Sequence, residues 1–262
     1  MDPILKLYSY INTQNSGNTY YKLSLFVIKN IKRLPNMSIS QFAEESFVSK
    51  ATITRFIQFL EFDGYTDFKS YFDRLLNSSS KLSFLKLTEP DVSDIQGAPL
   101  DFLHNYTQQI TEVIQDTAAS MDVQAIDSLI HSVKSAEKVA FLGFSDSNTI
   151  AKDIQLGCLS IGKLIEVAES TQKFHDILER FDSNDLIVIL SNYGNFFSVY
   201  HQLYNALLSK RIPLILVTQN YGTMDSFRFK QTIYLTSKRK LNIGNYPMRI
   251  FSEYFVRRIT FI

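Results

Sequence analysis

Five short apolar runs in the second half of the chain constrain its fold more than any other sequence feature. They lie at residues 139–142, 164–167, 186–190, 214–217 and 232–235, and aliphatic and β-branched residues fill most of their positions. Such runs are typical of strands buried on both faces, as in parallel sheets. Segments with helical spacing of apolar residues intervene at about 148–161, 195–210 and 246–260. Alternating strands and helices predict a doubly wound α/β domain with a mostly parallel sheet.

The first part of the chain shows helical spacing only. Apolar residues recur every three or four positions across 21–31, 39–46 and 50–60, which predicts three helices. After a serine run and several Pro, Gly and Asp residues comes a long amphipathic segment at 100–120, which predicts a fourth helix. The predicted fold is therefore of the α + α/β class, with an all-helical domain at 1–76, a linker at 77–99 and the α/β domain at 100–262.

Composition limits the kinds of protein that this chain can be. Its 262 residues suffice for two domains, and a formal net charge of +1 means that any surface for nucleic acid must be basic locally. No apolar run reaches the roughly 18 residues that cross a membrane, and the first residues lack a signal-peptide pattern. A single cysteine, Cys158, and no Cys/His cluster lead us to expect neither metal nor cofactor. We expect a cytoplasmic protein without membrane contact.

Two of the predicted helices, 39–46 and 50–60, are joined by a tight turn at Phe47 and Val48. Ser49 can cap the second of them. The buried side of that helix would consist of Ile53, Phe56, Ile57 and Leu60. From its outward side and its capped end we predict contacts with DNA by Ser49, Lys50, Ala51, Thr52, Thr54, Arg55 and Gln58.

A helix enters the major groove of DNA only if its outward residues are small or form hydrogen bonds. Thr54 and Gln58 can contact base edges, while Lys50 and Arg55 can reach phosphates or guanine. Other basic residues near this segment outnumber the acidic Glu44 and Glu45, namely Lys22, Lys29, Lys32 and Arg33. A small packing domain with a solvated polar face would show the same spacing, so the spacing alone leaves both interpretations open.

Hydroxyl and amide residues follow three of the predicted strands, at 143–148, 191–195 and 218–220. Open α/β sheets bind ligands at the carboxyl ends of their strands, and hydroxyls beside helix N-termini bind phosphate without a basic side chain. The same residues can simply cap the helices that follow, and this alternative fits each loop taken alone. The first two loops predict ligand contacts by Gly143, Ser145, Ser147, Ser191, Asn192, Tyr193, Gly194 and Asn195.

The N-terminal segment resembles the helix-turn-helix domain of the RpiR family of bacterial regulators. The resemblance is carried by 39–43, by the Val-Ser-x-x-Thr-x-x-Arg-Phe pattern at 48–56, and by 62–68. Two positions depart from the family, which usually has glycine at Glu61 and a small residue at Phe47. Because Glu61 lacks the conformational freedom of glycine, we expect the end of the second helix to be reshaped.

Residues 120–240 resemble a sugar-isomerase (SIS) domain, the phosphosugar-binding fold that RpiR regulators carry. Gly143 and Ser147 match the first Gly and the Ser of the family's Gly-x-Gly-x-Ser loop, with Ser145 at the second Gly. Ser191 and Gly194 match its Ser-x-Ser-Gly-x-Thr loop. The remaining two hydroxyl positions of that loop are occupied by Tyr193 and Phe196. The resemblance therefore implies a phosphosugar site that is weakened or shifted, with Phe196 filling part of the cavity.

Candidates for catalysis are weak. His175 and His201 lie on predicted helical segments and fit surface positions. Glu166 and Glu169 flank the second predicted strand, but no acid and base can be paired for proton transfer. We therefore predict no catalytic residue and expect the protein not to be an enzyme.

The resemblance implies a transcription regulator of carbohydrate metabolism genes. Its partners would be a double-stranded DNA operator, a sugar-phosphate effector and copies of itself, as a homodimer or tetramer. Dimer surfaces would come from 100–120 and from the last helix, through Phe251, Tyr254, Phe255 and Ile259. Two alternatives stay open: an SIS-type sugar-phosphate isomerase, and a regulator whose SIS domain only dimerises.

Overall fold

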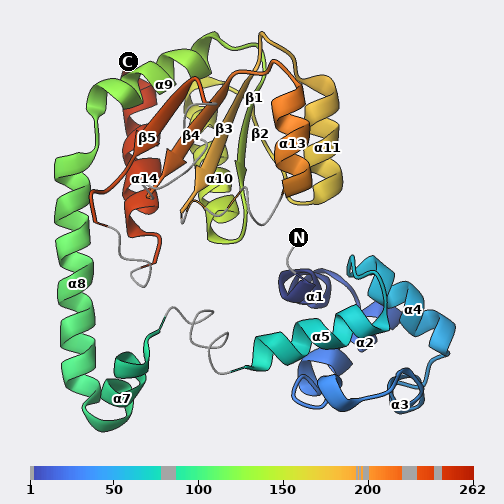
Figure 1. Ribbon diagram of the computed structural model, residues 1–262. Helices are drawn as coiled ribbons and strands as arrows, with labels where there is room; N and C mark the ends of the chain where they lie inside the picture. Colours follow the sequence, from blue (N-terminus) through green and yellow to red (C-terminus); the bar gives the residue numbers. More distant parts are fainter. Residues whose placement is uncertain are drawn as a thin grey trace. The chain divides into compact units, whose positions relative to one another are not determined.

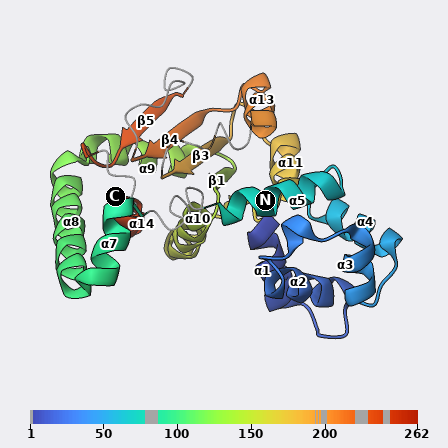
Figure 2. The ribbon, with the colours of Figure 1, turned by 60° about the horizontal axis from the view of Figure 1, so that its bottom comes forward.

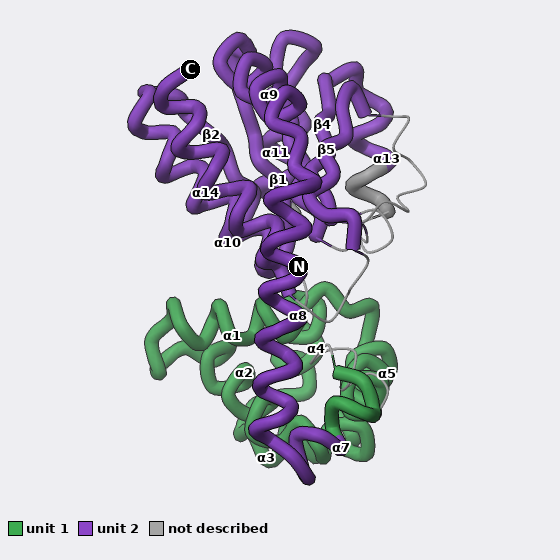
Figure 3. Tube along the Cα trace, turned by 90° about the vertical axis from the view of Figure 1, so that its left-hand side faces the viewer, with its two compact units in different colours: residues 1–92 green, residues 93–262 purple. Residues whose placement is uncertain are grey.

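The computed structural model divides the chain into two compact units, residues 1–92 and 93–262 (Figure 3). The residues that it describes are 3–77, 87–192, 194, 196, 201–219, 229–238 and 244–262, and the side chains of 171 and 201–204 are outside this description. Among the described helices, none is both long and apolar enough to span a membrane.

The described elements of unit 1 are all helical, as predicted. Its elements are α1 (Pro3–Thr13), α2 (Thr19–Lys29), the 3-10 turn η1 (Leu34–Asn36), α3 (Ile39–Glu45), α4 (Lys50–Phe59) and α5 (Tyr65–Leu76). Helices α2, α3 and α4 match the predicted ones, whereas α1 and α5 were not predicted. Phenylalanines dominate the core, and four of them are fully buried: Phe42, Phe56, Phe68 and Phe72. Large aromatic side chains let a small unit bury enough apolar surface to be stable.

Unit 2 contains a five-stranded sheet in which every pairing is parallel (Figure 1). Its strands are β1 (Val139–Gly143), β2 (Ile165–Val167), β3 (Leu186–Ser191), β4 (Leu214–Thr218) and β5 (Gln231–Tyr234), in the order β2-β1-β3-β4-β5. All five coincide with the predicted apolar runs. The predicted doubly wound α/β fold is confirmed.

Helices cover both faces of this sheet (Figures 1 and 2). One face is covered by α9 (Val123–Ser135), α10 (Asp146–Gly157) and α14 (Tyr246–Phe261), with the 3-10 turn η2 (Cys158–Ile161) after α10. The other face is covered by α11 (Thr171–Arg180) and α13 (His201–Ser209). Alternate strand residues serve the two faces, so Phe141 packs with α14 while Leu142 packs on the opposite side. This double covering is why the strands read as continuous apolar runs.

The last helix does not present the surface that we expected. Phe251, Phe255 and Ile259 are all 0% exposed and lie in the core of unit 2 against the sheet. The expectation that these three residues form a dimer surface is therefore wrong, because the apolar side of an amphipathic helix can equally be the side that covers a sheet. Tyr254, the fourth residue of that expectation, is partly buried against the same core.

The segment expected as a linker contains a helix. Helix α7 (Glu89–Gly97) lies within it and buries none of its residues. Thr88 caps α7, because its hydroxyl accepts a hydrogen bond from the Asp91 backbone N–H at 3.3 Å. In return, the backbone N–H and the hydroxyl of Thr88 donate to the Asp91 carboxylate at 2.6 and 2.7 Å. Pro90 lies in the first turn, where proline is compatible with a helix. The predicted 100–120 helix is confirmed as α8 (Pro99–Ser120), which extends beyond the sheet (Figures 1 and 3).

Three described residues other than glycine have positive φ, the conformation that L-amino acids usually avoid. They are Phe47 (φ 56°), Glu61 (φ 71°) and Ser145 (φ 53°). Helix α4 is followed by Glu61 in the left-handed conformation that a glycine would take. The expectation of a reshaped helix end is therefore wrong: the backbone keeps the glycine conformation, and the side chain pairs with Lys6 at 2.9 Å.

Candidate DNA-binding face and ligand-binding edge

Helix α4 has one buried side and one open side, because its apolar residues repeat at three and four positions. Ile53, Phe56 and Ile57 are at most 1% exposed and pack in the core of unit 1. All of the predicted DNA-contacting residues except the half-buried Thr52 are exposed, namely Ser49, Lys50, Ala51, Thr54, Arg55 and Gln58. The structure thus places these predicted residues together on the accessible side and N-terminal end of one helix.

Some of these polar groups already have partners in the helix itself. The Ser49 hydroxyl accepts a hydrogen bond from the Thr52 backbone N–H at 3.1 Å and lies 2.9 Å from the Thr52 hydroxyl. The Thr54 hydroxyl donates to the Lys50 carbonyl at 3.0 Å. Within the described residues, the side chains of Lys50, Arg55 and Gln58 form no hydrogen bond or ion pair. These three side chains are therefore the ones available to a partner without loss of an existing contact.

The turn before α4 projects an aromatic side chain. Phe47 is 94% exposed and has a left-handed backbone, which directs its ring away from the core. Basic charge nearby is partly neutralised, because Arg33 forms a two-fold hydrogen-bonded ion pair with Glu45 at 2.7 and 3.0 Å. Arg33 therefore contributes less to the positive potential of unit 1 than its place in the sequence suggested.

In unit 2, the parallel register brings two of the predicted loops together. Gly143 at the end of β1 pairs with Leu190, and the next residue of β3, Ser191, pairs with Thr218 at the end of β4. The residues after β1 and β3 therefore leave the same edge of the sheet on neighbouring strands. This arrangement matches the place where open α/β sheets bind ligands.

The first loop turns very tightly. A Cβ on Gly143 would lie 2.7 Å from backbone atoms of Ser147, so only glycine fits there. Ser147 is 4% exposed, and its hydroxyl forms no hydrogen bond within the described residues. The amide of Asn148 donates to the carbonyl oxygens of Gly143 at 3.2 Å and Ala168 at 2.8 Å, which holds the start of α10. A hydroxyl in the first turn of a helix, beside its free backbone N–H groups, is suited to bind a ligand oxygen.

In the second loop, the polar side chains of Ser191 and Asn192 already have hydrogen-bond partners within the protein. The Ser191 hydroxyl accepts a weak hydrogen bond from the Phe196 backbone N–H at 3.4 Å. The side-chain amide oxygen of Asn192 accepts one from the side-chain amide of Gln219 at 3.2 Å. Gly194 has φ 69°, a conformation that favours glycine. Two predicted ligand contacts of this loop, Tyr193 and Asn195, lie outside the described residues.

Phe196 is 3% exposed and joins the apolar core of unit 2. Its ring lies 5.1 Å from that of Phe144 in the first loop, measured between ring centroids. The two predicted loops are thus linked by an aromatic contact where the resemblance places a hydroxyl, which agrees with the expectation that Phe196 fills part of this space.

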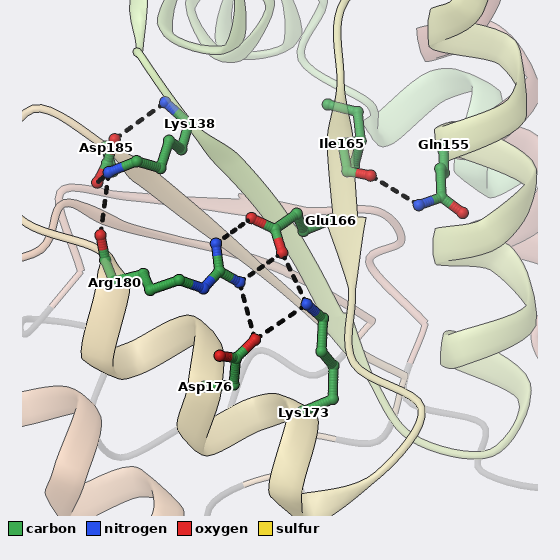
Figure 4. Close-up of polar contacts among 8 residues, drawn as sticks. All are labelled: Lys138, Gln155, Ile165, Glu166, Lys173, Asp176, Arg180 and Asp185. Carbon is green, nitrogen blue, oxygen red and sulfur yellow. Dashed lines mark hydrogen bonds and ion pairs between the residues drawn. The ribbon is translucent and has the colours of Figure 1, made fainter.

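The acidic candidates near the second strand have structural partners (Figure 4). Glu166 forms ion pairs with Arg180 at 2.7 Å and Lys173 at 3.0 Å, and both cations also pair with Asp176 at 3.0 Å. The hydrogen bonds from Arg180 lower the pKa of Glu166, against the effect of burial, and those from Lys173 add to this. A carboxylate held in its charged form by two cations is a poor proton carrier. His175, also proposed as a surface residue, is exposed on α11.

Cys158 is fully buried, and burial raises the pKa of its thiol to about 11. A thiol of this kind is inert, and Cys158 serves as a small apolar residue of the core. Within the described residues, no group of His, Cys, Asp and Glu side chains is placed to hold a metal ion.

Comparison with known protein families identifies both units. Residues 11–79 match the model described as the helix-turn-helix domain of the rpiR family, and residues 132–249 match the SIS-domain model. Together these matches cover more than half of the chain. The chain belongs to the RpiR family. Its architecture is that of the family's transcription regulators, a DNA-binding helix-turn-helix domain followed by an SIS domain.

Curated relatives of this RpiR-family protein are named as regulators. An uncharacterized HTH-type transcriptional regulator of Thermotoga maritima is 26% identical over 212 residues, which are 78% of this chain and 71% of that protein. The HTH-type transcriptional regulator GlvR of Bacillus subtilis is 26% identical over 206 residues, which are 78% and 72% of the two chains. These names agree with the role that the two domains indicate.

Solved structures confirm the fold. The NanR protein of Vibrio vulnificus, complexed with ManNAc-6P, matches with a TM-score of 0.51 and 18% identity over 98% of this chain and 89% of that one. The sugar isomerase domain of an RpiR transcription factor from Sphaerobacter thermophilus matches with a TM-score of 0.51 and 13% identity over 59% and 87%. At these identities the comparison establishes the architecture of the chain and nothing about its ligand.

Proposed function

We propose that this RpiR-family regulator binds a double-stranded operator through α4 and senses a phosphorylated sugar at the carboxyl edge of the β-sheet. The observation that carries the sensing role is the place of Ser147, which is 4% exposed and lies in the first turn of α10, at the edge where β1 and β3 end side by side. Gly143 brings the backbone of the loop against Ser147. Ser191 supplies a second hydroxyl on the neighbouring strand. Regulation of carbohydrate metabolism genes would follow from such a ligand.

The DNA-binding role is supported by the open side of α4. Lys50 and Arg55 provide charge for phosphates or guanine, and Gln58 one turn later can form paired hydrogen bonds with adenine. Ser49, Ala51, Thr52 and Thr54 keep this side of the helix small enough to approach base edges. In a homodimer or tetramer, two copies of α4 would bind the two half-sites of a pseudo-palindromic operator.

Ligand affinity should be low for a phosphosugar sensor. Hydrogen bonds to a charged ligand contribute roughly 1.5–3 kcal/mol each. Tyr193 and Phe196 occupy two positions where the resembling loops carry hydroxyls, so affinity should fall about a hundredfold or more. Asn192 is the described polar residue of that loop that can compensate.

Catalysis of sugar isomerisation is not part of the proposal. An isomerase needs a base that moves a proton between sugar carbons. Glu166 is held by Arg180 and Lys173, and Glu169 pairs with Lys152 at 2.5 Å. Neither carboxylate is therefore available as that base without breaking an ion pair.

The ligand half of the proposal is tested by calorimetric titration with hexose, aminosugar and pentose phosphates. We expect at least one of them to bind in the range of about 0.1 to 1 mM, well above the micromolar range of an intact site. Gly143→Ala should abolish that binding, because its Cβ would collide with Ser147. Gly97→Ala is the matched control, since its Cβ meets nothing within 4 Å. No binding by any of these sugars would refute the sensing role.

The DNA half is tested with operator DNA and two arginine variants. Arg55→Ala should weaken specific binding by roughly 1–3 kcal/mol, because a base or phosphate contact is lost. Arg257→Ala removes the same charge from α14 in unit 2, where the side chain is 70% exposed, and should leave the operator affinity nearly unchanged. Equal effects of the two variants would show that α4 is not the reading helix.

A further inference from the structure

A continuous path of hydrogen bonds connects the second ligand loop with helix α8. Its first step lies between β3 and β4, where the Thr218 hydroxyl donates to the Ser191 carbonyl at 2.7 Å. Its second step leads to the end of β5, where the Leu235 backbone N–H donates to the Thr218 carbonyl at 3.0 Å. Thr218 is fully buried, so both bonds are shielded from water. The position of the backbone at Ser191 is thereby linked to that of the segment after β5.

That segment holds α8 mainly through the carboxylate of Asp116. Asp116 accepts hydrogen bonds from the Thr236 hydroxyl, from the Ser237 hydroxyl and from the Ser237 backbone N–H, the last at 2.8 Å. Burial raises the pKa of Asp116, but the hydrogen bonds from Ser237 and Thr236 outweigh it and lower the pKa overall. One turn earlier on α8, Glu112 pairs with Lys238 at 3.5 Å. Two turns of α8 are therefore attached to three consecutive residues at the ligand-binding edge.

Helix α8 has few other attachments to unit 2. It packs against α14, and only Val113 and Thr117 among its residues are buried. Its N-terminal part extends beyond the sheet and carries Leu100 and Leu103, which are 79% and 58% exposed (Figures 1 and 3). From there the chain continues backward through α7 into unit 1. Helix α8 therefore lies in the chain between unit 1 and the sheet of unit 2, so a movement of α8 acts directly on the segment that leads to unit 1.

We infer that Asp116 is a positioning residue that couples the ligand-binding edge to helix α8. A ligand that contacts Ser191 moves the strand ends, and the bonds through Thr218 and Leu235 pass this movement to Thr236 and Ser237. Because Asp116 holds both residues, α8 follows. This inference rests on the proposed function for the identity of the signal, but the mechanical link exists in the protein without any ligand.

Hydrogen exchange of backbone amides in the full-length protein tests this link in the absence of ligand. Thr218→Val removes the hydroxyl that bonds Ser191 and keeps the side-chain shape. We expect exchange of the α8 amides at 112–120 to become about threefold or more faster. Thr218→Ser retains the hydroxyl and should restore slow exchange. Thr232→Val is the matched control, because the Thr232 hydroxyl is buried without a partner and no link is lost.

A double-mutant cycle tests the role of Asp116. Asp116→Asn alone should speed exchange in α8, and adding Thr218→Val to it should have little further effect, because the path is already broken. Asp101→Asn, an exposed carboxylate on the same helix, is the control for charge. Unchanged α8 exchange in Thr218→Val, independent effects of the two substitutions, or equal acceleration in α11 would each overturn the inference. Failure of the phosphosugar titration would remove the proposed signal and leave this result standing.

Discussion

At the scale of single residues, three of the places where this chain departs from the motifs of its family share one backbone feature. Phe47, Glu61 and Ser145 replace residues that are small or glycine in the resembling patterns, and these are the three described non-glycine residues with positive φ. At these positions the backbone has the left-handed conformation that glycine favours, although a larger side chain is present. Each such residue costs on the order of 1 kcal/mol, which the packing of the surrounding unit must supply.

The strain at Phe47 can be measured. Its side chain is 94% exposed, so Phe47→Gly removes strain without removing packing. The free energy of unfolding should rise by roughly 0.5–1 kcal/mol, since relief of the left-handed conformation exceeds the added entropy of the unfolded chain. Urea denaturation of the two proteins provides the comparison. Gln58→Gly, within α4, should instead destabilise by about 1 kcal/mol, and a loss of stability in Phe47→Gly would show that the turn is unstrained.

The sequence predicted where these residues lie relative to the helices, but not their backbone conformation. The positions of Phe47 and Glu61 between predicted helices were recognisable, whereas a left-handed φ leaves no mark on a phenylalanine or glutamate. The partner of Glu61 is equally hidden, because Lys6 lies 55 residues away on a helix that was not predicted. Long-range pairs of this kind depend on tertiary packing.

At the scale of elements, periodicity predicted the strands well and the shorter helices poorly. The three inner strands, β1, β3 and β4, are buried along their whole length, and a continuous apolar run is a direct consequence of that burial. Helix α11 was not predicted, although Phe174, Ile177, Leu178 and Phe181 follow helical spacing and Ser170 caps it. Helix α7 was obscured by proline and glycine, which also occur at helix ends.

Helices α10 and α14 approach closely at Gly157. A Cβ there would lie 2.3 Å from a methyl group of Val256, a stiff side chain that cannot turn away easily. Gly157→Ala should therefore destabilise the protein by about 1–3 kcal/mol despite the better helix propensity of alanine. Thermal unfolding would measure the loss, and the double variant Gly157→Ala with Val256→Ala should recover part of it. No loss in the single variant would contradict this packing.

The ion pairs between β2 and α11 make stability depend on pH. Interactions with Arg180 and Lys173 hold the pKa of Glu166 below its ordinary value of 4.5. A lowered folded-state pKa contributes stability that is fully present above about 4.5 and is lost as pH falls through the folded value. Glu166→Gln should therefore be destabilising at pH 7, and its difference from the natural protein should shrink in acid. Urea midpoints at pH 7 and at about pH 3.5 test this, and a difference independent of pH would count against it.

At the scale of the whole molecule, the sequence predicted the two kinds of domain, and the structure and the family comparisons agree. The open side of α4 and the shared edge of β1 and β3 were both derivable from spacing and strand order. The burial of Phe251 and Phe255 was not, because a helix that covers a sheet and a helix that dimerises have the same apolar pattern. The path from Ser191 to Asp116 could not be predicted from the sequence either, because each of its links depends on strand register and tertiary packing.

A net charge of +1 gives the chain little general attraction to DNA, so the proposed operator binding requires local contacts, for which Lys50 and Arg55 are our candidates. Specific contacts of this kind still release counterions, and the affinity should fall as salt rises.

The proposed function requires that one protein both bind DNA and respond to a sugar phosphate. The most direct measurement is binding of the purified protein to DNA from its own upstream region, at two salt concentrations, with and without the panel of sugar phosphates. The account predicts specific, salt-sensitive binding whose affinity changes by roughly fivefold or more with at least one sugar phosphate at millimolar concentration. Specific binding that is indifferent to every sugar phosphate would contradict the sensing role and leave the SIS domain to dimerisation alone.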